Sequence, residues 1–419
     1  MRNTNNTKRI SRNDLLTELI NLKQVIFEVT DDCNLSCKYC IYGGLYGGHD
    51  SRNSKYMSFK DAKAVIDFLV DIWNSHPTFA EQPETHIGFY GGEPLMNFPL
   101  IQQVVEYVEG LHLSRLFHFS MTSNCLLLDR YMDYIAEKEF NLLCSLDGDK
   151  VSNGHRIRKD GSSSFEKVFA NIKLLKSKHP TYFAQKVSFN SVIHNLNDVQ
   201  STSDFIRSEF DKIPFFSELS PVGVLPEKID DFHETFKDVS KSIHEANDYN
   251  ALWKRIGLSN PEVQTVIRFI EAFEDNVYHS YYDLYNDIEA PLVTPSGTCI
   301  PFSKKMFVKV DGKIMQCEQV PHKYSLGNVF DGEVSINLDK IASDFNSRLD
   351  RIQPLCNVCF LRCMCPQCMY RMNNLEDEHP KCEYFMTKKQ FMDFRKDFLF
   401  YLHKHPETYK LAMFDSMAI

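Results

Sequence analysis

The chain has 419 residues, of which 43% are hydrophobic and 25% charged, as in an ordinary globular protein with room for two or three domains. Its net charge of −9 argues against a general nucleic-acid binder, and no apolar run is long enough to span a bilayer. The polar, basic start lacks the apolar core of a signal peptide, so we expect a cytoplasmic protein with no membrane or nucleic-acid partner. In that reducing compartment a count of 13 cysteines points to metal or iron–sulfur cluster ligation rather than disulfides. Only Cys125 and Cys144 stand alone, in apolar strand-like segments, and these two should be small core residues.

Short apolar runs alternate with longer amphipathic segments between about residues 23 and 223. The runs predict strands at Gln24–Thr30, Thr85–Tyr90, Leu116–Thr122, Asn141–Leu146, Lys186–Ile193 and Phe216–Val222. Apolar spacing near 3.6 predicts helices at Ser58–Trp73, Pro99–Leu113, Asp129–Lys138, Phe165–Lys176 and Asn197–Phe210. Ser58 and Asp129 are good N-caps for their helices. Such repeated units predict a parallel sheet, and since they are too few for an eight-unit barrel, we expect an α/β fold with a partial (β/α)6 TIM-type barrel.

The strand signals stop after residue 225. Apolar residues on one helical face predict the first of two bridging helices: Phe232, Phe236, Val239 and Ile243. Asn260-Pro261 is a good start for the second. Eight cysteines follow, and then an aromatic-rich helix from Thr387 to about His403. The expected division is an N-terminal segment 1–22, a barrel 23–225, a helical bridge 226–290, a cysteine-rich domain 291–385, and a C-terminal helix and tail 386–419.

Three cysteines, Cys33, Cys37 and Cys40, follow the first predicted strand at C-x3-C-x2-C spacing. Thiolates are the usual ligands of iron–sulfur clusters, and a [4Fe–4S] cluster takes four. Three cysteines would therefore leave one iron open to a small molecule. A zinc knuckle or three unrelated buried thiols are the alternatives, although zinc would want a fourth Cys or His at short range.

Polar residues also follow the ends of the next predicted strands, at the face where barrel active sites lie. The relevant segments are Tyr90-Gly91-Gly92-Glu93-Pro94, Thr122-Ser123-Asn124 and Ser145-Leu146-Asp147-Gly148. The two glycines would let the backbone come close to a ligand, although the motif alone could be a turn. Arg156 or Arg158 could pair with a carboxylate by a bidentate contact, or be a surface arginine.

Together, the three cysteines and Gly91-Gly92-Glu93 resemble the radical S-adenosylmethionine (radical SAM) enzymes. The resemblance implies an open six-unit barrel and a [4Fe–4S] cluster whose open iron takes the methionine amine and carboxylate of S-adenosylmethionine. An electron from the cluster then releases a 5′-deoxyadenosyl radical. The resemblance further implies cofactor-binding residues: Tyr39 against adenine, Gly91, Gly92, Glu93 and Pro94 at the amine, Ser123, Asn124, Ser145 and Asp147 along the ribose and the radical's path, and Arg158 at the carboxylate.

The later cysteines resemble the SPASM domain, which binds auxiliary iron–sulfur clusters. By that match one [4Fe–4S] cluster is held by Cys356, Cys359, Cys365 and Cys382. A second is held by Cys299, Cys317 and Cys368, with its fourth iron open or bound by substrate or by Cys363. Two departures from the pattern leave these ligands uncertain, because Cys363 is extra and Cys368 comes one residue early. Two zinc sites with four thiolates each are the alternative. The resemblance covers residues 24–385 and implies three clusters in all.

SPASM-type proteins mostly form thioether or carbon–carbon crosslinks in ribosomally made peptides, or oxidise Cys or Ser to formylglycine in sulfatases. In sulfatase maturases an Asp directly follows the Gly-x4-Cys cysteine and is thought to take the substrate proton, whereas Glu318 stands there in this chain. Because one methylene moves the carboxylate, we expect a crosslinking enzyme with Glu318 as the catalytic proton acceptor, and a sulfatase maturase as the alternative.

The expected partners are a precursor peptide, flavodoxin or ferredoxin as electron donor, and a separate leader-binding protein, since residues 1–22 are too short for such a domain. A non-catalytic iron–sulfur or zinc scaffold is the alternative of another class. It has no use for an open iron, and the cysteine triad with Gly91-Gly92-Glu93 therefore opposes it.

Overall fold

The computed structural model describes residues 7–47, 53–78, 83–221, 223–257, 260–273, 293–372 and 374–410. The chain divides into two compact units. The barrel unit comprises Leu22–Ile256 and Lys305–Ile336, and the cysteine-rich unit comprises Met1–Asn21, Gly257–Lys304 and Asn337–Ile419.

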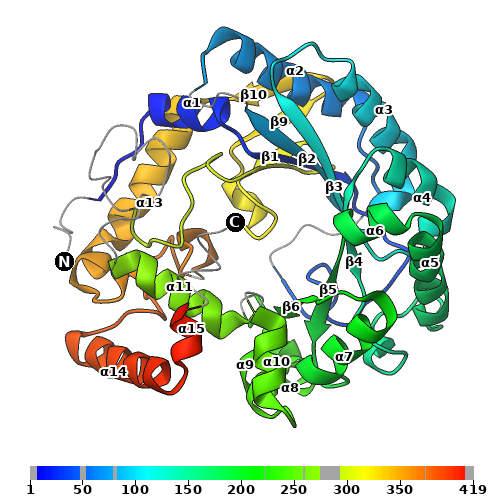
Figure 1. Ribbon diagram of the computed structural model, residues 1–419. Coiled ribbons are helices and arrows are strands. Elements are labelled where there is room, and N and C mark those ends of the chain that lie inside the picture. Colours follow the sequence, from blue (N-terminus) through cyan, green and yellow to red (C-terminus); the bar gives the residue numbers. More distant parts are fainter. Residues whose placement is uncertain are drawn as a thin grey trace. The chain divides into compact units, whose positions relative to one another are not determined.

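Six parallel strands form the barrel of the barrel unit. They are β1 (Gln24–Thr30), β2 (Glu84–Gly91), β3 (Leu116–Ser123), β4 (Asn141–Ser145), β5 (Val187–Ile193) and β6 (Phe215–Glu218). Each strand pairs in parallel with the next, and the sheet ends at β6. Figure 1 shows the strands in an arc that runs from β1 to β6. The predicted partial (β/α)6 barrel is confirmed. The last predicted strand is shorter than expected, and Val222 lies outside the described residues.

Helices follow the strands on the outer side of this arc (Figure 1). They are α2 (Phe59–Ser75), α3 (Phe98–Glu109), α4 (Leu128–Glu137), α5 (Phe165–Lys178), α6 (Pro180–Lys186) and α7 (Val199–Phe210). As predicted, Ser58 caps α2, because its hydroxyl accepts from the Asp61 N–H at 3.1 Å. The N-cap prediction for Asp129 is wrong: buried Leu128 already begins α4, and Asp129 lies in its first turn and pairs with Lys167 at 2.6 Å.

Between strands and helices lies the core of the barrel unit. Along β5 buried and half-buried residues alternate, as expected for a strand with helices on one face only. The largest fully buried side chains of this unit include Phe27, Phe89, Phe140, Phe189 and Phe210. Burying each aromatic ring contributes about 1.5–3 kcal/mol relative to leaving it exposed. This packing fixes the strand ends that carry the candidate site.

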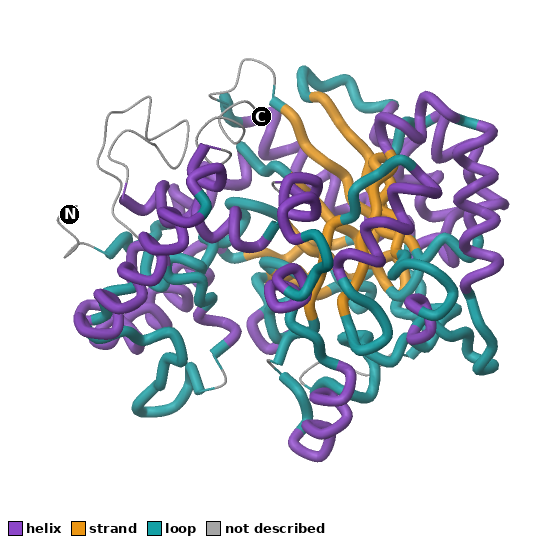
Figure 2. The backbone as a smooth tube through the Cα atoms, turned by 60° about the horizontal axis from the view of Figure 1, so that its bottom comes forward, coloured by secondary structure: helices purple, strands orange, loops and turns teal. Residues whose placement is uncertain are grey.

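A further set of short strands extends the same sheet beyond β1. Its members are β7 (Met306–Val308), β8 (Lys313–Met315), β9 (Gly327–Phe330) and β10 (Glu333–Ile336). The first pairs in parallel with β1, and the others continue antiparallel. In Figure 2 the strands of the barrel unit run side by side. Residues 305–336 fall inside the range expected for the cysteine-rich domain, yet they are part of the barrel unit.

The predicted helical bridge differs from its expected form. The described part of 226–290 holds not two helices but α8 (Ile229–Thr235), α9 (Val239–His244), α10 (Tyr249–Ile256) and α11 (Pro261–Phe273), the last starting at Pro261 as predicted. Residues 274–290 of the predicted bridge lie outside the described residues.

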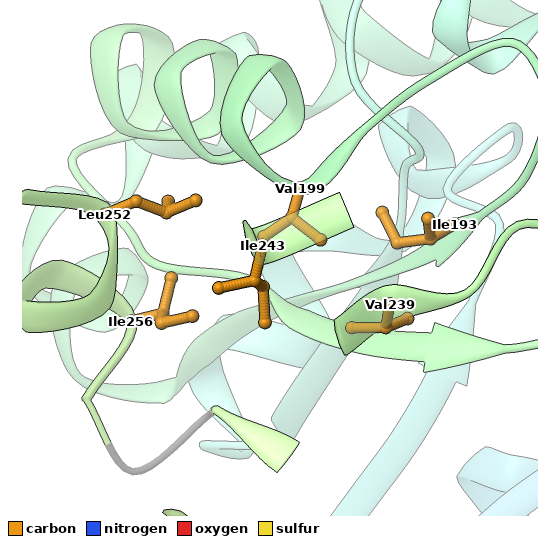
Figure 3. Close-up of a cluster of buried hydrophobic side chains, with 6 residues drawn as sticks. All are labelled: Ile193, Val199, Val239, Ile243, Leu252 and Ile256. Carbon is orange, nitrogen blue, oxygen red and sulfur yellow. The ribbon is translucent and has the colours of Figure 1, made fainter. Parts of the chain in front are cut away.

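The four apolar residues expected on one helical face belong to two clusters. Phe232 and Phe236 pack with Tyr39. Val239 and Ile243 instead join a cluster shown in Figure 3, whose other members are Ile193, Val199, Leu252 and Ile256. The break comes from Asp238, whose carboxylate accepts from the Lys241 N–H at 2.6 Å and starts a new helix.

The cysteine-rich unit is helical. It holds α11 together with α1 (Arg12–Ile20), α13 (Leu338–Val358), α14 (Lys388–Lys404) and α15 (Pro406–Lys410). The Asn346 amide on α13 donates to the Ile10 carbonyl at 2.8 Å and ties the segment before α1 to α13. As predicted, Thr387 begins the C-terminal helix, in a capping box with Gln390. Among the described helices none is long and apolar enough to cross a membrane.

Candidate cluster and cofactor site

The loop after β1 brings the three predicted thiols together. Cys33 and Cys40 both act electrostatically on Cys37, and burial raises the pKa of Cys37 to about 12. The Asp31 carboxylate holds the root of the loop, where it accepts from the Lys55 N–H at 2.6 Å. The segment around His155 borders its other side, because the Lys38 N–H donates to the His155 carbonyl at 3.1 Å.

The two glycines at the end of β2 hold this loop from a second side. The Gly92 N–H donates to the Thr30 carbonyl, and the Glu93 N–H to the Asp32 carbonyl, both at 2.9 Å. A Cβ on Gly91 would lie 2.1 Å from the Thr30 oxygen, and one on Gly92 1.9 Å from the Asp32 oxygen. We expected these glycines to admit a ligand. The close approach in the structure is instead to the chain's own backbone, at the root of the cysteine loop.

Glu93 joins the ends of β2 and β3. Its carboxylate is 1% exposed and accepts from the Ser123 hydroxyl at 2.7 Å, the Asn124 N–H at 2.8 Å and the Leu95 N–H at 3.2 Å. Burial raises the pKa of Glu93 to about 7, although these bonds oppose the rise. All three donors are neutral, and a carboxylate has about four acceptor sites. A cation such as an amine would therefore stabilise this group. Pro94, which follows it, is buried at the start of a 3-10 turn, Pro94–Asn97.

Replacing Glu93 by glutamine should remove a pH dependence of stability. The pKa of about 7 exceeds the unfolded value of 4.5, so the folded state binds more protons between these values and wild-type stability falls as pH rises through them. The lost stability should be about 3 kcal/mol. Urea unfolding of cluster-free protein should be measured at pH 5 and pH 8. Relative to wild type, the free energy of unfolding of Glu93→Gln should be higher at pH 8 than at pH 5. Glu106→Gln, an exposed change on α3, is the control, and equal pH slopes for all three proteins would contradict the expectation.

Two buried donors at the cysteine loop lack a hydrogen-bond partner in the described part of the chain. The Asn124 amide donates to the Asn34 Oδ1 at 2.8 Å and lies 3.8 Å from the Cys33 Sγ. Arg158 pairs with Leu35 of the loop as an isolated bridge. The buried Nδ2 of Asn34 and Nε of Arg158 have no hydrogen-bond partner in the described part of the chain. Each such donor costs about 1–3 kcal/mol, which a carboxylate or sulfide acceptor would offset. The site thus fits a cluster with a carboxylate-bearing ligand.

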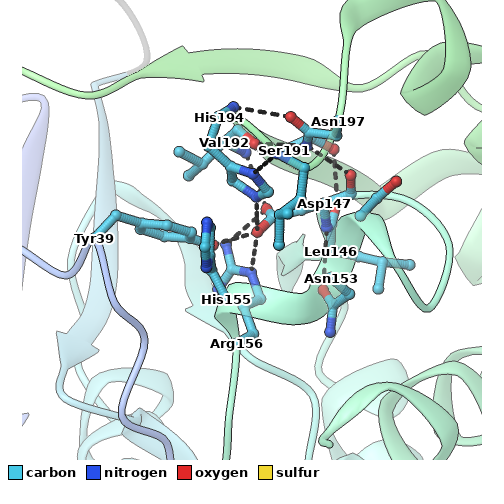
Figure 4. Close-up of polar contacts among 12 residues, drawn as sticks. Tyr39, Leu146, Asp147, Asn153, His155, Arg156, Ser191, Val192, His194 and Asn197 are labelled. Carbon is cyan, nitrogen blue, oxygen red and sulfur yellow. Dashed lines mark hydrogen bonds and ion pairs between the residues drawn. The ribbon is translucent and has the colours of Figure 1, made fainter. Parts of the chain in front are cut away.

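Around Asp147, after β4, a buried polar network forms (Figure 4). Its carboxylate accepts from Arg156 Nε and Nη2 at 3.0 and 3.1 Å, from the Val192 N–H at 3.0 Å and from the Tyr39 hydroxyl. Although burial raises it, the positive charge of Arg156 and these bonds lower the pKa of Asp147 to about 2. The Tyr39 ring stacks on His194 with centroids 5.5 Å apart.

This network bears on several predicted cofactor residues. The carboxylate of Asp147 and the hydroxyl of Tyr39 already bind other protein groups, so direct cofactor contacts from them stay a proposal. Ser145 lies buried at the end of β4. The guanidinium of Arg156 is hydrogen-bonded to Asp147. Of the two predicted arginines, Arg158 is therefore the one with a buried nitrogen that could bind a carboxylate.

Four of the later cysteines lie close to one another in the cysteine-rich unit. Burial raises the pKa of Cys356 to about 12, and Cys365, Cys382 and Cys359 raise it further through their charges. These four are the predicted ligands of one auxiliary cluster. Cys299 acts in the same way on Cys368, while Cys363 lies in a 3-10 turn, Arg362–Met364. No group of three or more His, Cys, Asp or Glu side chains is placed to hold a single metal ion within the described residues.

Glu318 directly follows Cys317, in the segment after β8 of the barrel unit. Its two carboxylate oxygens lie 3.3 and 3.2 Å from the Lys305 Nζ, and both side chains are mostly buried. Sequence reasoning missed Lys305, which has no motif around it. It also missed His194, although a polar residue directly after β5 is the same signal that identified Asn124 after β3.

Comparison with known protein families covers the part of the chain that holds this candidate site. The model of the radical SAM superfamily matches residues 27–206. The chain contains a radical SAM domain.

Known relatives include a radical SAM cyclopropyl synthase, TigE, of Paramaledivibacter caminithermalis, 22% identical over 54% of this chain and 47% of that protein. An uncharacterized protein of Methanocaldococcus jannaschii is 31% identical over 37% of this chain and 49% of its own length. The chain thus spans about half the length of these two relatives. A cysteine-type anaerobic sulfatase-maturating enzyme of Clostridium perfringens is 22% identical over 89% of this chain and 96% of that protein.

A solved structure has the same fold over most of the chain. Native anSMEcpe with bound AdoMet and a peptide superposes with a TM-score of 0.61, over 93% of this chain and 98% of that one. Because the sequence identity is 16%, the likeness concerns the fold alone. It extends beyond the radical SAM domain into the cysteine-rich unit.

Proposed function

We propose that the chain is a radical SAM enzyme that modifies a ribosomally made peptide by forming a thioether or carbon–carbon crosslink. The observation that carries the proposal is the cysteine loop itself. Its three thiols lie together, Gly91 and Gly92 hold its root, and the unsatisfied donors of Asn34 and Arg158 border it. A cluster and a carboxylate-bearing ligand bound at the loop would satisfy these donors, which supports the proposal.

Each residue has a defined task in this proposal. Cys33, Cys37 and Cys40 hold a [4Fe–4S] cluster, which together with bound S-adenosylmethionine supplies a 5′-deoxyadenosyl radical for hydrogen abstraction. Glu93 accepts a charge-assisted hydrogen bond from the cofactor's ammonium, and Arg158 pairs with its carboxylate. Residues at the ends of β3 and β4 and in the loop would hold the cofactor's ribose and adenine: Ser123, Asn124, Ser145, Asp147 and Tyr39.

Two auxiliary clusters complete the proposed cofactor set. The proposed ligands of one cluster are Cys356, Cys359, Cys365 and Cys382. Their closeness to one another supports this assignment. The ligands of the other, namely Cys299, Cys317 and Cys368 with or without Cys363, rest on the cysteine pattern. Glu318 would take a proton from the substrate radical, and an auxiliary cluster would supply an acceptor for its electron. Flavodoxin or ferredoxin would supply electrons, a separate protein would bind the leader peptide, and the cytoplasm is the proposed location.

An anaerobic sulfatase maturase is the second candidate. The Clostridium perfringens enzyme aligns with 89% of this chain, which favours it. Glu318 in place of the expected Asp favours the crosslinking enzyme instead.

Mass spectrometry separates the two candidates. The chain should be co-expressed with a short peptide encoded beside its gene, and separately with a cysteine-containing sulfatase peptide. We expect the first peptide to lose two hydrogens per crosslink and the second to stay unchanged. Conversion of the sulfatase cysteine to an aldehyde, with the other peptide unmodified, would establish the maturase activity instead.

A further inference from the structure

The two faces of the barrel sheet differ in how deeply their side chains are buried. Helices cover the outer side of the strand arc (Figure 1). On β5, Phe189 points to these helices, because its ring lies 4.8 Å from that of Phe210 on α7 and 6.3 Å from that of Phe183 on α6. Successive side chains of a strand point to opposite faces, so Ser188 and Asn190 point to the inner face. Phe189 is completely buried, whereas these two polar side chains are only half-buried.

Strand pairing continues this inner face onto both neighbours of β5. Asn190 pairs with Ser145 of β4 and with Phe215 of β6, and paired residues of parallel strands point to the same side. Ser217, two residues after Phe215, therefore lies on the inner face as well. The Phe215 side chain is 53% exposed, and Ser217 is half-buried. Asn190 thus lies between a residue of the proposed cofactor site and an exposed aromatic ring.

A hydrogen bond fixes the orientation of the Asn190 carboxamide. The Ser217 hydroxyl donates to the Asn190 Oδ1 at 2.7 Å. This bond uses the amide oxygen, and the nitrogen on the other side of the group keeps two N–H donors for a further acceptor. A side chain that is already oriented loses little conformational entropy when it binds a ligand. Asn190 therefore has the properties of a binding side chain rather than of a core residue.

Asn190 also lies close to the place where the proposed reaction occurs. Adjacent strands are about 4.7–4.9 Å apart, so Asn190 is one strand away from Ser145, the residue at the cofactor's ribose in the proposed function. On its other side, β6 is the last strand of the described sheet. A molecule bound between Phe215 and Asn190 is consequently within reach of a radical formed beside Ser145.

We propose that Asn190 binds the peptide substrate, with its amide donating to a backbone carbonyl oxygen of the peptide and the Phe215 ring packing against the same segment. The inference deepens the proposed function and rests on it. A peptide bond suits this pair of side chains, because its carbonyl accepts an N–H and its flat surface packs on an aromatic ring. An aliphatic side chain at this place would leave the amide donors without an acceptor.

The test uses the full chain with its clusters and the short peptide encoded beside its gene. Asn190→Leu keeps the approximate size of the side chain and removes its donors. Ser217→Ala is a milder change, which removes only the bond that orients the amide. Asn141→Leu is the matched control, because Asn141 begins β4 on the same inner face, about 13 Å along the strand from Ser145.

Calorimetry measures the affinities for the peptide and for S-adenosylmethionine, and steady-state rates give KM and kcat. We expect Asn190→Leu to weaken peptide binding and raise KM about tenfold, because the peptide carbonyl loses its donor, while the affinity for S-adenosylmethionine stays the same. Ser217→Ala should shift both in the same direction by less, and Asn141→Leu should match wild type.

Two results would overturn the inference. One is an unchanged peptide affinity in Asn190→Leu, which would mean that water satisfies the amide. The other is a loss of affinity for S-adenosylmethionine with peptide affinity intact, which would make Asn190 a cofactor residue. A wild-type protein that neither binds nor modifies the peptide would refute the proposed function instead.

Discussion

Replacing Cys33, Cys37 and Cys40 together by alanine should abolish cleavage of S-adenosylmethionine and leave the auxiliary clusters in place. The three thiols belong to one loop of the barrel unit. The four cysteines grouped around Cys356 belong to the other unit, so their cluster does not depend on this loop. Without these ligands the cluster is not bound and cannot deliver an electron to S-adenosylmethionine. The carbon–sulfur bond is then not cleaved. The loss should be complete within the detection limit.

Iron content and 5′-deoxyadenosine release check this expectation on the same anaerobic preparation. Cys144→Ala is the matched control, since Cys144 is completely buried in β4 and lies outside the proposed cluster ligands. The control should keep both iron and cleavage. Loss of all iron in the triple variant would show that the two cysteine groups are not independent sites, contrary to our assignment.

Changing Glu318 to glutamine should separate cofactor cleavage from product formation. Hydrogen abstraction leaves a carbon radical that must lose an electron and often a proton. Glu318 directly follows Cys317, and an ion pair with Lys305 holds its carboxylate in place. Positioned proton acceptors typically contribute 10²–10⁴-fold. We therefore expect at least a 100-fold loss of modified peptide, with 5′-deoxyadenosine release within about twofold of wild type.

Liquid chromatography with mass spectrometry can quantify both products in one reaction. Glu318→Asp keeps a carboxylate and should retain much more product than Glu318→Gln. If modified peptide stays at the wild-type level in Glu318→Gln, the carboxylate is an ordinary ion-pair partner of Lys305. If both products fall together, Glu318 supports the cofactor site rather than the substrate.

How far the sequence predicts the fold depends on the length of each element. Most barrel strands and helices have periodic patterns long enough to predict them, whereas the short helix α6 was not predicted and the short strand β6 was predicted too long. Strands β7 to β10 are only three or four residues long, too short for a pattern, and they exist because they pair with β1 and with one another. The bridge was mispredicted for a related reason. Phe232 and Phe236 are apolar because they pack on Tyr39, far away in the sequence, and not because one helix continues to Ile243.

The same limit applies to the site. Cysteine spacing identified the three thiols that the structure brings together, because loop ligands of a cluster are close in sequence. The sequence shows that Gly92 has no Cβ. It does not show that the Asp32 carbonyl oxygen occupies the space where a Cβ would lie. The bonds from Tyr39 and Arg156 to Asp147, and from Lys305 to Glu318, form only after folding has brought separate segments together.

Release of 5′-deoxyadenosine from S-adenosylmethionine by the reconstituted wild-type protein tests the central claim most directly. The protein should be reconstituted with iron and sulfide without oxygen, reduced, and assayed with and without reductant. We expect release that requires the reductant and the three cysteines of the loop. A protein with its full complement of iron that binds S-adenosylmethionine and releases no 5′-deoxyadenosine under reducing conditions would contradict the account.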